Sequence, residues 1–344
     1  MVTITAVAEA AGVSIATVSR VINQSSRVSA DKVRAVQRAM VDLGYRPPAR
    51  PLRGRGVRAV PGPSRPTVAS QGSLALLIPD HRDVALRTAL SARFIHGLND
   101  VCQAQGLALQ VTSLEPDGGL PPSIAKALVD GVAVRATVPV ADLARRIPSH
   151  LPVVWLLETV EDSLFRGDQV LEDTAAIGRL AAQHLLDRGH RCVATINNDP
   201  AHPCYARRIA AFTAVIRAAG GEVIAFDGGR LLTTAELPAL ALRLLADPRQ
   251  PTGLFLPLND EGTAAIQRGF NEHGGLRQRR LDQVACGYDR GLMAALNPDL
   301  YNIDIQAEAM AQTAGEILLW RLTHPEAPRR RILMEPSIRH VGPA

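Results

Sequence analysis

The chain has 344 residues, 47% of them apolar and 3% aromatic, which suits two or three domains with aliphatic cores rather than one small domain. The net charge of +5 is uneven, because residues 1–60 carry ten Lys or Arg and three Asp or Glu and the remainder carries −2. No apolar run approaches the roughly 20 residues of a membrane helix, and Met1 leads directly into an amphipathic segment without a signal peptide. We therefore expect a cytoplasmic protein whose amino-terminal end has the positive field that nucleic acid attracts.

The first predicted elements are two short helices joined by a tight turn. An apolar segment over residues 4–11 meets Gly12, which adopts a left-handed turn at little cost. Ser14 has the chemistry of an N-cap for the next helix. Val18 and Val21 lie three apart on that helix, on the face that would pack against the first. Two helices joined in this way are typical of a helix-turn-helix.

A third helix is predicted over residues 29–43, ending at Gly44. Its apolar residues recur at helical spacing and would close a three-helix core. They are Val33, Val36, Met40 and Leu43. An ordinary helical hairpin at the start of an unrelated domain is the alternative, but it does not account for the exposed Arg20 beside this core.

This segment resembles the headpiece of the lactose-repressor (LacI/GalR) family of bacterial transcription regulators. The resemblance is carried by Thr3-Ile4, Val7-Ala8, Ala11-Gly12-Val13-Ser14, Thr17-Val18-Ser19-Arg20-Val21-Ile22-Asn23, Val28-Ser29 and Leu43-Gly44-Tyr45-Arg46-Pro47. It implies a helix-turn-helix DNA-binding headpiece over residues 1–46. It also implies a homodimer that binds a near-palindromic double-stranded DNA operator and responds to a small molecule.

The resemblance assigns DNA-contacting roles within the headpiece. Ile15, Ala16 and Arg20 are expected to face base edges in the major groove, where Arg20 can fork onto a guanine. A second group is expected to hold phosphates and set the register. It comprises Ser14, Thr17, Ser19, Asn23 and Arg27.

Residues 47–72 contain six prolines, four glycines and five arginines and therefore read as a hinge or linker. The resemblance implies a hinge helix here that inserts a leucine into the minor groove. Ala49, Arg50 and Leu52 are its expected DNA contacts. Pro51 falls in the interior of that helix, where proline costs roughly 3 kcal/mol, so an extended basic arm along the phosphates is the alternative.

From residue 73 onward, short apolar strands alternate with amphipathic helices, as in parallel sheets covered on both faces. Strands are predicted at 74–78, 107–112, 132–134, 153–157, 192–196, 223–226, 253–257 and 283–287. Helices are predicted around 94–102 and at 123–129, 141–147, 174–188, 206–219, 236–246 and 261–273. We expect two doubly wound lobes, the first over about 73–160 plus 306–324 and the second over about 161–303 plus 325–340.

This second part also resembles the family, more loosely. The matching segments are Val129-Asp130-Gly131, the run from Asp173 to Arg191, Arg208-Ile209-Ala210-Ala211-Phe212, Asn259-Asp260 and Gly287-Tyr288-Asp289. They imply a periplasmic-binding-protein-like (type I) α/β sensor over residues 73–344 that binds an effector and dimerises.

Three polar residues are predicted to bind the effector because each lies at a strand end or on the first turn of the following helix. They are Arg208, Asn259 and Asp289, a set that suits a hydroxyl-rich ligand such as a carbohydrate. The structural alternatives are that Asn259 caps the next helix and that Arg208 pairs with a surface acid. His202, Cys204 and Tyr205 are weaker candidates that we place in a surface loop.

The remaining motifs argue against enzyme chemistry. The four cysteines make no metal-ligand spacing and are expected to be free thiols, and no P-loop, catalytic triad or paired acids are apparent. We therefore expect no cofactor, no metal and no catalytic residues. Trp155 is predicted to lie in a core, and residues 329–331, three consecutive arginines, in a solvated loop. The rival functions are a sugar-binding protein without a DNA role and a sugar-modifying enzyme.

Overall fold

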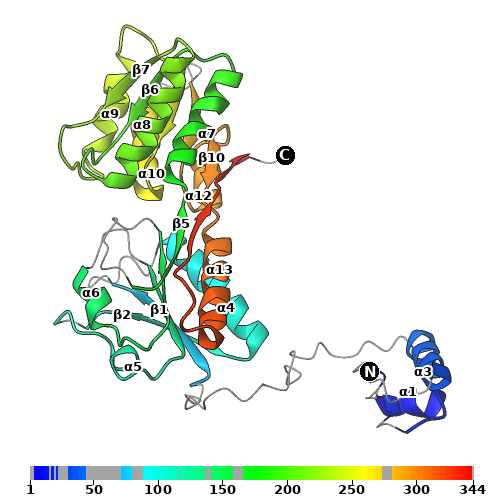
Figure 1. Cartoon of the computed structure of the whole chain (residues 1–344). Helices are drawn as coiled ribbons and strands as arrows, with labels where there is room; N and C mark the ends of the chain where they lie inside the picture. Colours follow the sequence, from blue (N-terminus) through cyan, green and yellow to red (C-terminus); the bar gives the residue numbers. More distant parts are fainter. Residues whose placement is uncertain are drawn as a thin grey trace. The chain divides into compact units, whose positions relative to one another are not determined.

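The computed structural model describes residues 4–14, 17, 18, 21, 30–43, 71–79, 88–115, 117–135, 141–157, 166–272 and 281–342. The chain forms two compact units, Met1–Arg65 and Pro66–Ala344 (Figure 1). Each unit is described separately below. No helix in the described residues is long and apolar enough to cross a membrane.

The first unit is a small helical domain containing α1 (Ile4–Ala10) and α3 (Ala30–Asp42). Its core is formed by Val7, Ala8, Val18, Val36 and Ala39, each buried, with Val13, Val21 and Met40 packed against them. The predicted packing of the second helix on the first through Val18 and Val21 is therefore confirmed. Leu43 was expected to face this core, but α3 ends at Asp42 and Leu43 lies in the following turn, 36% exposed.

The second unit contains two six-stranded sheets, each in its own lobe. The first lobe comprises β1 (Ser73–Ile78), α4 (Ala89–Gln105), β2 (Ala108–Ser113), α5 (Pro122–Ala125), β3 (Gly131–Arg135), α6 (Ala141–Arg146), β4 (Val153–Leu156), β5 (Asp168–Glu172), α13 (Ala307–Thr323) and β11 (Arg331–Met334). The second comprises α7 (Thr174–Asp187), β6 (Cys192–Ile196), α8 (Pro203–Ala218), β7 (Glu222–Phe226), α9 (Leu237–Leu245), β8 (Gly253–Leu256), α10 (Asp260–Glu272), β9 (Asp282–Ala285), α12 (Arg290–Leu296), β10 (Tyr301–Asp304) and β12 (Ser337–His340).

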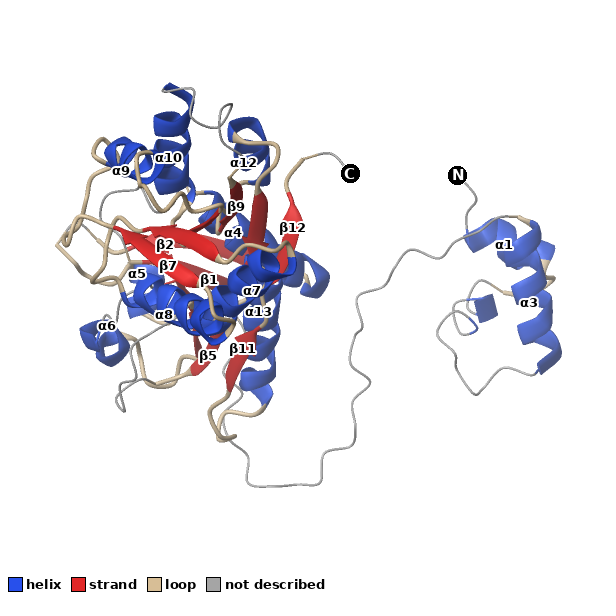
Figure 2. Ribbon diagram, turned by 90° about the horizontal axis from the view of Figure 1, so that it is seen from above, coloured by secondary structure: helices blue, strands red, loops and turns tan. Residues whose placement is uncertain are grey.

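The strand orders are β11-β5-β4-β3-β1-β2 and β12-β10-β9-β8-β6-β7, so both sheets are doubly wound as predicted. All pairs are parallel except β10 with β12, which run antiparallel at the edge of the second sheet. Helices pack on both faces of the sheets (Figure 2). The central parallel strands β1 and β8 are apolar with every residue buried, whereas the outer strands β2, β7 and β11 are partly exposed.

The predicted lobe boundaries need two corrections. Residues 168–172 were assigned to the second lobe, but β5 pairs with β4 and β11 in the first sheet. Residues 331–334 were also assigned to the second lobe, whereas β11 lies beside β5. The chain therefore crosses between the lobes three times, after β5, after β10 and between β11 and β12.

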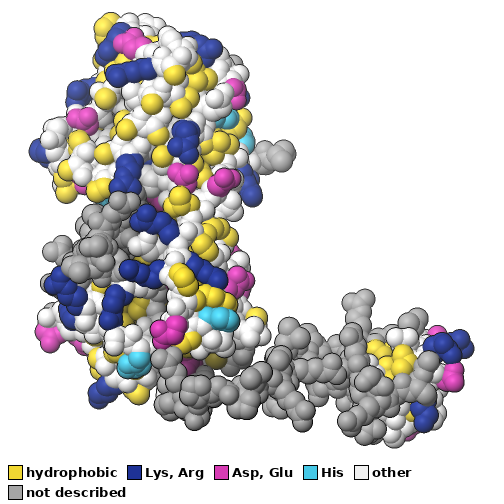
Figure 3. Space-filling view, viewed as in Figure 1, with side chains coloured by type: hydrophobic (Ala, Val, Ile, Leu, Met, Phe, Trp, Pro, Cys, Tyr) yellow, Lys and Arg dark blue, Asp and Glu magenta, His cyan; other side chains and the backbone are white. Residues whose placement is uncertain are grey.

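The predicted core residues and free thiols are confirmed. Trp155 is fully buried on β4, and its indole nitrogen donates to the carbonyl oxygen of Arg166 at 2.7 Å. All four cysteines are free, and three of them are buried. On the visible face, apolar side chains form only small groups among charged ones (Figure 3).

The two lobes are built around close helix contacts that require glycine. In the second lobe α7 lies against α8, and a Cβ on Gly178 would overlap the carbonyl oxygen of Arg208. In the first lobe α4 lies equally close to α13, at Gly97 and Glu308. Because Gly178 sets the distance between α7 and α8, it also fixes the position of Arg208.

Gly178→Ala should destabilise the protein by about 1–3 kcal/mol, since the added methyl group forces α8 away from α7. Urea unfolding followed by circular dichroism would measure the change. Gly291→Ala is the matched control, because a Cβ there meets nothing closer than 3.4 Å and stability should hold or rise slightly. Equal stability of the two variants would contradict the packing argument.

Candidate functional site

The turn of the helix-turn-helix has the geometry that the sequence predicts. Gly12 adopts a φ of +63°, and the amide of Val13 donates to the carbonyl oxygen of Ala8 at 3.0 Å. Ser14 accepts from the amide of Thr17 at its side-chain oxygen (3.2 Å) and lies 3.0 Å from the Thr17 hydroxyl. The predicted N-cap is therefore confirmed.

The residues predicted to contact DNA are only partly among the described residues. Ser14 is exposed and Thr17 is half-buried at the start of the second helix, where their hydroxyls cap the turn. The other predicted contacts lie outside the described residues, and their roles remain predictions. These are Ile15, Ala16, Ser19, Arg20, Asn23, Arg27, Ala49, Arg50 and Leu52.

Arg208 is the most deeply buried of the predicted effector residues, at 2% exposed. From α8, its Nη2 donates to Glu172 Oε1 and its Nη1 donates to the carbonyl oxygen of Pro257, both at 2.8 Å. Glu172 ends β5 of the first sheet and Pro257 follows β8 of the second, so one guanidinium links the carboxyl ends of strands from both lobes. Burial alone would lower the pKa of Arg208, but the Glu172 carboxylate offsets this and raises it well above the usual range.

Asn259 and Asp289 both act as helix caps in the structure. Asn259 Oδ1 accepts from the amide of Gly262 at the start of α10, and Asp289 Oδ1 accepts from the amide of Leu292 at the start of α12, each at 2.9 Å. The alternative role expected for Asn259, a cap on the next helix, is therefore observed. Both residues are exposed, so a cap role leaves room for a ligand to contact the rest of each side chain.

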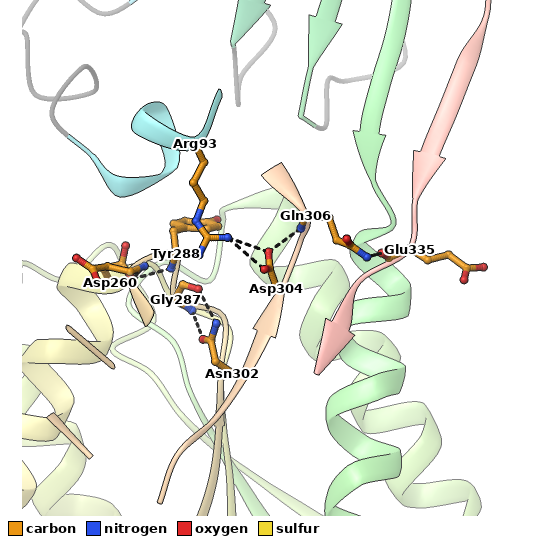
Figure 4. A network of polar contacts seen from close by, with 9 residues as sticks. Arg93, Asp260, Gly287, Tyr288, Asn302, Asp304, Gln306 and Glu335 are labelled. Carbon is orange, nitrogen blue, oxygen red and sulfur yellow. Dashed lines mark hydrogen bonds and ion pairs between the residues drawn. The ribbon is translucent and has the colours of Figure 1, made fainter. Parts of the chain in front are cut away.

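Asp260 joins these two caps, as Figure 4 shows. Its Oδ1 accepts from the amides of Tyr288 (2.7 Å) and Asp289 (3.1 Å), which ties the end of β8 to the end of β9. Burial, together with the nearby Asp289 carboxylate, raises the pKa of Asp260 despite these bonds. Asn302 makes a similar link, exchanging two hydrogen bonds with the backbone of Gly287, both at 2.8 Å.

The second and third crossings between the lobes meet in the same network (Figure 4). Arg93 of α4 in the first lobe donates through Nη1 to both oxygens of Asp304, at 3.1 and 3.3 Å. Asp304 also accepts from the amide of Gln306, whose side chain donates to the carbonyl oxygen of Glu335 at 3.2 Å. Polar contacts therefore hold both crossings to α4.

The prediction of a surface loop is wrong for Cys204 and Tyr205, which lie on α8, whereas His202 does lie in the loop before the helix. Pro203 starts α8, and His202 is the residue before it. Cys204 is buried, and burial raises the pKa of its thiol to about 11. The rings of His202 and Tyr205 stack at 4.4 Å, and the Tyr205 ring centroid lies 5.9 Å from the Arg208 guanidinium carbon. An early helix start, which Pro203 at the first position favours, was the signal in the sequence.

Several buried polar atoms at this end of the second sheet lack a hydrogen-bond partner. They are the Nε of Arg208, the Nδ1 of His202 and the Oδ1 of Asn198. Burial lowers the pKa of His202, so its imidazole is neutral near pH 7 and can accept a hydrogen bond. Buried polar groups are almost always satisfied, and a polar ligand would supply the missing partners.

Glu172 is the site residue that sequence reasoning missed. It lies 36 residues before Arg208, and only the fold brings the pair together. Thr174 donates its hydroxyl to the same carboxylate oxygen at 3.2 Å. The alternative that Arg208 pairs with a surface acid is therefore half right, because its partner is an acid that is buried.

The described residues also place one trio of metal-ligand types outside this region. His96 and Asp100 of α4 and Glu308 of α13 have ligand atoms within 4.8 Å of one another. His96 Nδ1 lies 2.9 Å from Glu308 Oε1, and that hydrogen bond raises the pKa of His96. The trio is explained as an ion-pair group that joins α4 to α13.

Models of two protein families match separate segments of this chain. The model of "bacterial regulatory proteins, lacI family" matches residues 3–48, and that of the "periplasmic binding protein-like domain" matches residues 182–340. The HTH-type transcriptional repressor PurR of Vibrio parahaemolyticus is 25% identical, covering 98% of this chain and 97% of its own length. The chain therefore contains a lacI-family segment followed by a periplasmic-binding-protein-like segment. The predicted resemblance is thereby confirmed, and the similar proteins named here are transcriptional repressors.

Two solved structures show the same fold over nearly the whole of this chain. A CelR–cellobiose complex has a TM-score of 0.62 at 22% identity and covers 99% of this chain and 100% of its own. The lac repressor dimer bound to operator and the anti-inducer ONPF has a TM-score of 0.59 at 20% identity and covers 99% of each chain. The predicted architecture, a helix-turn-helix headpiece followed by two doubly wound lobes, is confirmed.

Removing one partner of the Glu172–Arg208 pair should be costly. Their side chains are only 4% and 3% exposed, so Glu172→Gln leaves an uncompensated buried charge and should lose about 3–5 kcal/mol. The double variant Glu172→Gln/Arg208→Met should recover part of this loss. A double-mutant cycle measured by urea unfolding should give a coupling free energy of about 0.5–3 kcal/mol.

The exposed pair Arg230–Glu236 provides the control for this cycle. Arg230→Met and Glu236→Gln should have effects that simply add, because water screens this pair. Additive losses at Glu172 and Arg208 would show that the buried pair does not act as a unit.

Proposed function

We propose that this chain is a sequence-specific DNA-binding repressor of the LacI family whose operator affinity is set by a small molecule. The observation that carries the proposal is the Gly12 turn followed by the Ser14 cap, which presents a second helix on a three-helix core. This headpiece lies within the first sixty residues, where the chain's positive charge is concentrated. Its place of action is the bacterial cytoplasm, where operator DNA lies.

The proposed active form is a homodimer on a near-palindromic operator. A single headpiece buries too little surface for tight binding, so two headpieces act together on half-sites about one helical turn apart. The similar lac repressor structure is a dimer bound to operator, which supports this assembly.

The proposed effector is a carbohydrate held between the lobes by Arg208, Asn259 and Asp289. Support comes from the convergence of these residues at the carboxyl ends of β8 and β9, through Pro257 and Asp260. The unpartnered Arg208 Nε and His202 Nδ1 beside them suit hydroxyl groups, which both donate and accept. A similar protein, CelR, was solved with cellobiose.

Effector control then acts through the crossings between the lobes. A ligand at the strand ends changes the headpiece spacing only if it binds two lobe arrangements with different affinity. The partly exposed contact of Arg93 with Asp304 joins the lobes and is therefore the expected site of rearrangement, whereas the buried pair of Arg208 and Glu172 stays closed.

Arg20→Ala should weaken operator binding by about 1–3 kcal/mol per half-site, because the variant loses a forked contact to guanine. The measurement is a gel shift with labelled DNA from upstream of the protein's own gene. Arg34→Ala removes the same charge from exposed α3 and serves as the control. Equal binding by both variants would reject the base-reading role.

Asp289→Ala should lose effector response and keep DNA binding, with about 1.5–3 kcal/mol less effector affinity. A thermal-shift panel of mono- and disaccharides that includes cellobiose, run beside purine bases, identifies the ligand. Asp289→Ser keeps an N-cap while removing the carboxylate and should lose the response without destabilising α12. An unchanged binding isotherm in Asp289→Ser would refute the pocket assignment.

A sugar-binding protein without a DNA role is the alternative. It predicts saccharide binding in the thermal-shift panel together with no gel shift on any duplex. The matched lacI-family headpiece argues against it.

A further inference from the structure

Glu172 is held in place at the first crossing between the lobes. It ends β5, which lies between β4 and β11, and the next residue, Asp173, caps α7 by accepting from the amide of Ala176 at 2.8 Å. The Thr174 hydroxyl donates to the same Glu172 oxygen that bonds Arg208. The Glu172 side chain is only 4% exposed, so its carboxylate cannot exchange the guanidinium for water.

Arg208 has most of its hydrogen-bonding capacity committed within the chain. Arginine recognises an acidic group through two parallel N–H donors. Here Nη2 donates to Glu172 and Nη1 donates to the carbonyl oxygen of Pro257, whereas the buried Nε lacks a partner among the described residues. Nε carries a single N–H, which suits one hydroxyl oxygen and not the two oxygens of an acid.

Two further carboxylates make these strand ends unfavourable for an acidic ligand. Asp260 and Asp289, which follow β8 and β9, have no ion pair with Lys or Arg in the part of the chain that the structure describes. Arg290 donates instead to the backbone of β12 at 3.4 Å, and Arg93 is matched by Asp304 at 3.1 Å. A second negative charge placed here would therefore be repelled.

We propose that Glu172 fills, from within the chain, the place at Arg208 that an acidic group of an effector would otherwise take. The inference rests on the proposed effector site and narrows its ligand to an uncharged molecule, because a hydroxyl oxygen can accept from Nε while the ion pair stays closed. A carboxylate or phosphate would have to displace Glu172 and leave that acid buried without its cation, which is strongly unfavourable. Glu172 is thereby the residue that sets specificity against acidic ligands.

The first test compares matched neutral and acidic sugars on the full-length wild type and on Glu172→Ala, which leaves room for a carboxylate beside Arg208. The pairs are ribose with ribose 5-phosphate and cellobiose with cellobionate, measured by isothermal titration calorimetry. The wild type should bind each neutral sugar at least about tenfold more tightly than its acid. In Glu172→Ala the ratio of acid to neutral affinity should rise by about 10–100-fold, because the charge of Arg208 is then unmatched.

Glu236→Ala is the matched control, since it removes the same side chain from the exposed pair with Arg230 and should keep the wild-type ratio.

A second test needs no sugar and serves also where Glu172→Ala is unstable. Formate is the smallest carboxylate and can take the vacated place beside Arg208. At about 100 mM it should raise the thermal unfolding midpoint of Glu172→Ala by about 2–5 °C, as expected for a ligand that binds about tenfold below that concentration. A Glu172→Ala chain that folds only in formate meets the same expectation. Uncharged formamide should have no such effect, and neither the wild type nor Glu172→Ala/Arg208→Met should respond to formate.

Acidic sugars that bind the wild type as tightly as their neutral partners would overturn the inference while the proposed effector site stands. An unchanged affinity ratio or an absent formate response in Glu172→Ala would overturn it equally. A wild type that binds none of the four sugars would count against the carbohydrate effector of the proposed function, and the formate response alone would then decide whether Glu172 fills an anion site at Arg208.

Discussion

The second unit depends on one buried ion pair. It joins Glu172, at the end of β5 in the first lobe, to Arg208 on α8 of the second lobe. Because the pair is almost fully desolvated, its charges cannot separate without a large loss of free energy. The guanidinium also reaches the backbone after β8, so the pair fixes the ends of strands from both sheets at one place. Gly178 makes this possible by letting α7 and α8 approach closely.

This pair sets the charge balance of the proposed effector site. An arginine whose charge is matched by a carboxylate presents a polar but electrically balanced surface, which suits an uncharged polyhydroxy ligand better than a phosphorylated one. The Nε of Arg208 and the neutral imidazole of His202 can then hydrogen-bond and orient hydroxyl groups. Asn259, Asp260 and Asp289 hold the helix starts around this region in register with each other.

The sequence predicts well what is encoded locally. Gly12 and Ser14 carry their own turn and cap chemistry, and the apolar run of β1 identifies a covered strand without knowledge of the rest. Prediction fails where partners are distant: β5 begins and ends with acids, so its sequence does not show that β4 and β11 enclose it. Glu172 likewise looks like an ordinary surface acid until α8 covers it.

The placement of the last two strands has a consequence for how the protein is made. β11 borders β5 in one sheet and β12 borders β10 in the other, although only two residues separate them along the chain. A polypeptide lacking this stretch would turn β5 and β10, which are otherwise paired on both sides, into edge strands of the two sheets at once, and exposed edges can pair with foreign strands. Each sheet therefore acquires its last strand only when residues 331–340 are in place.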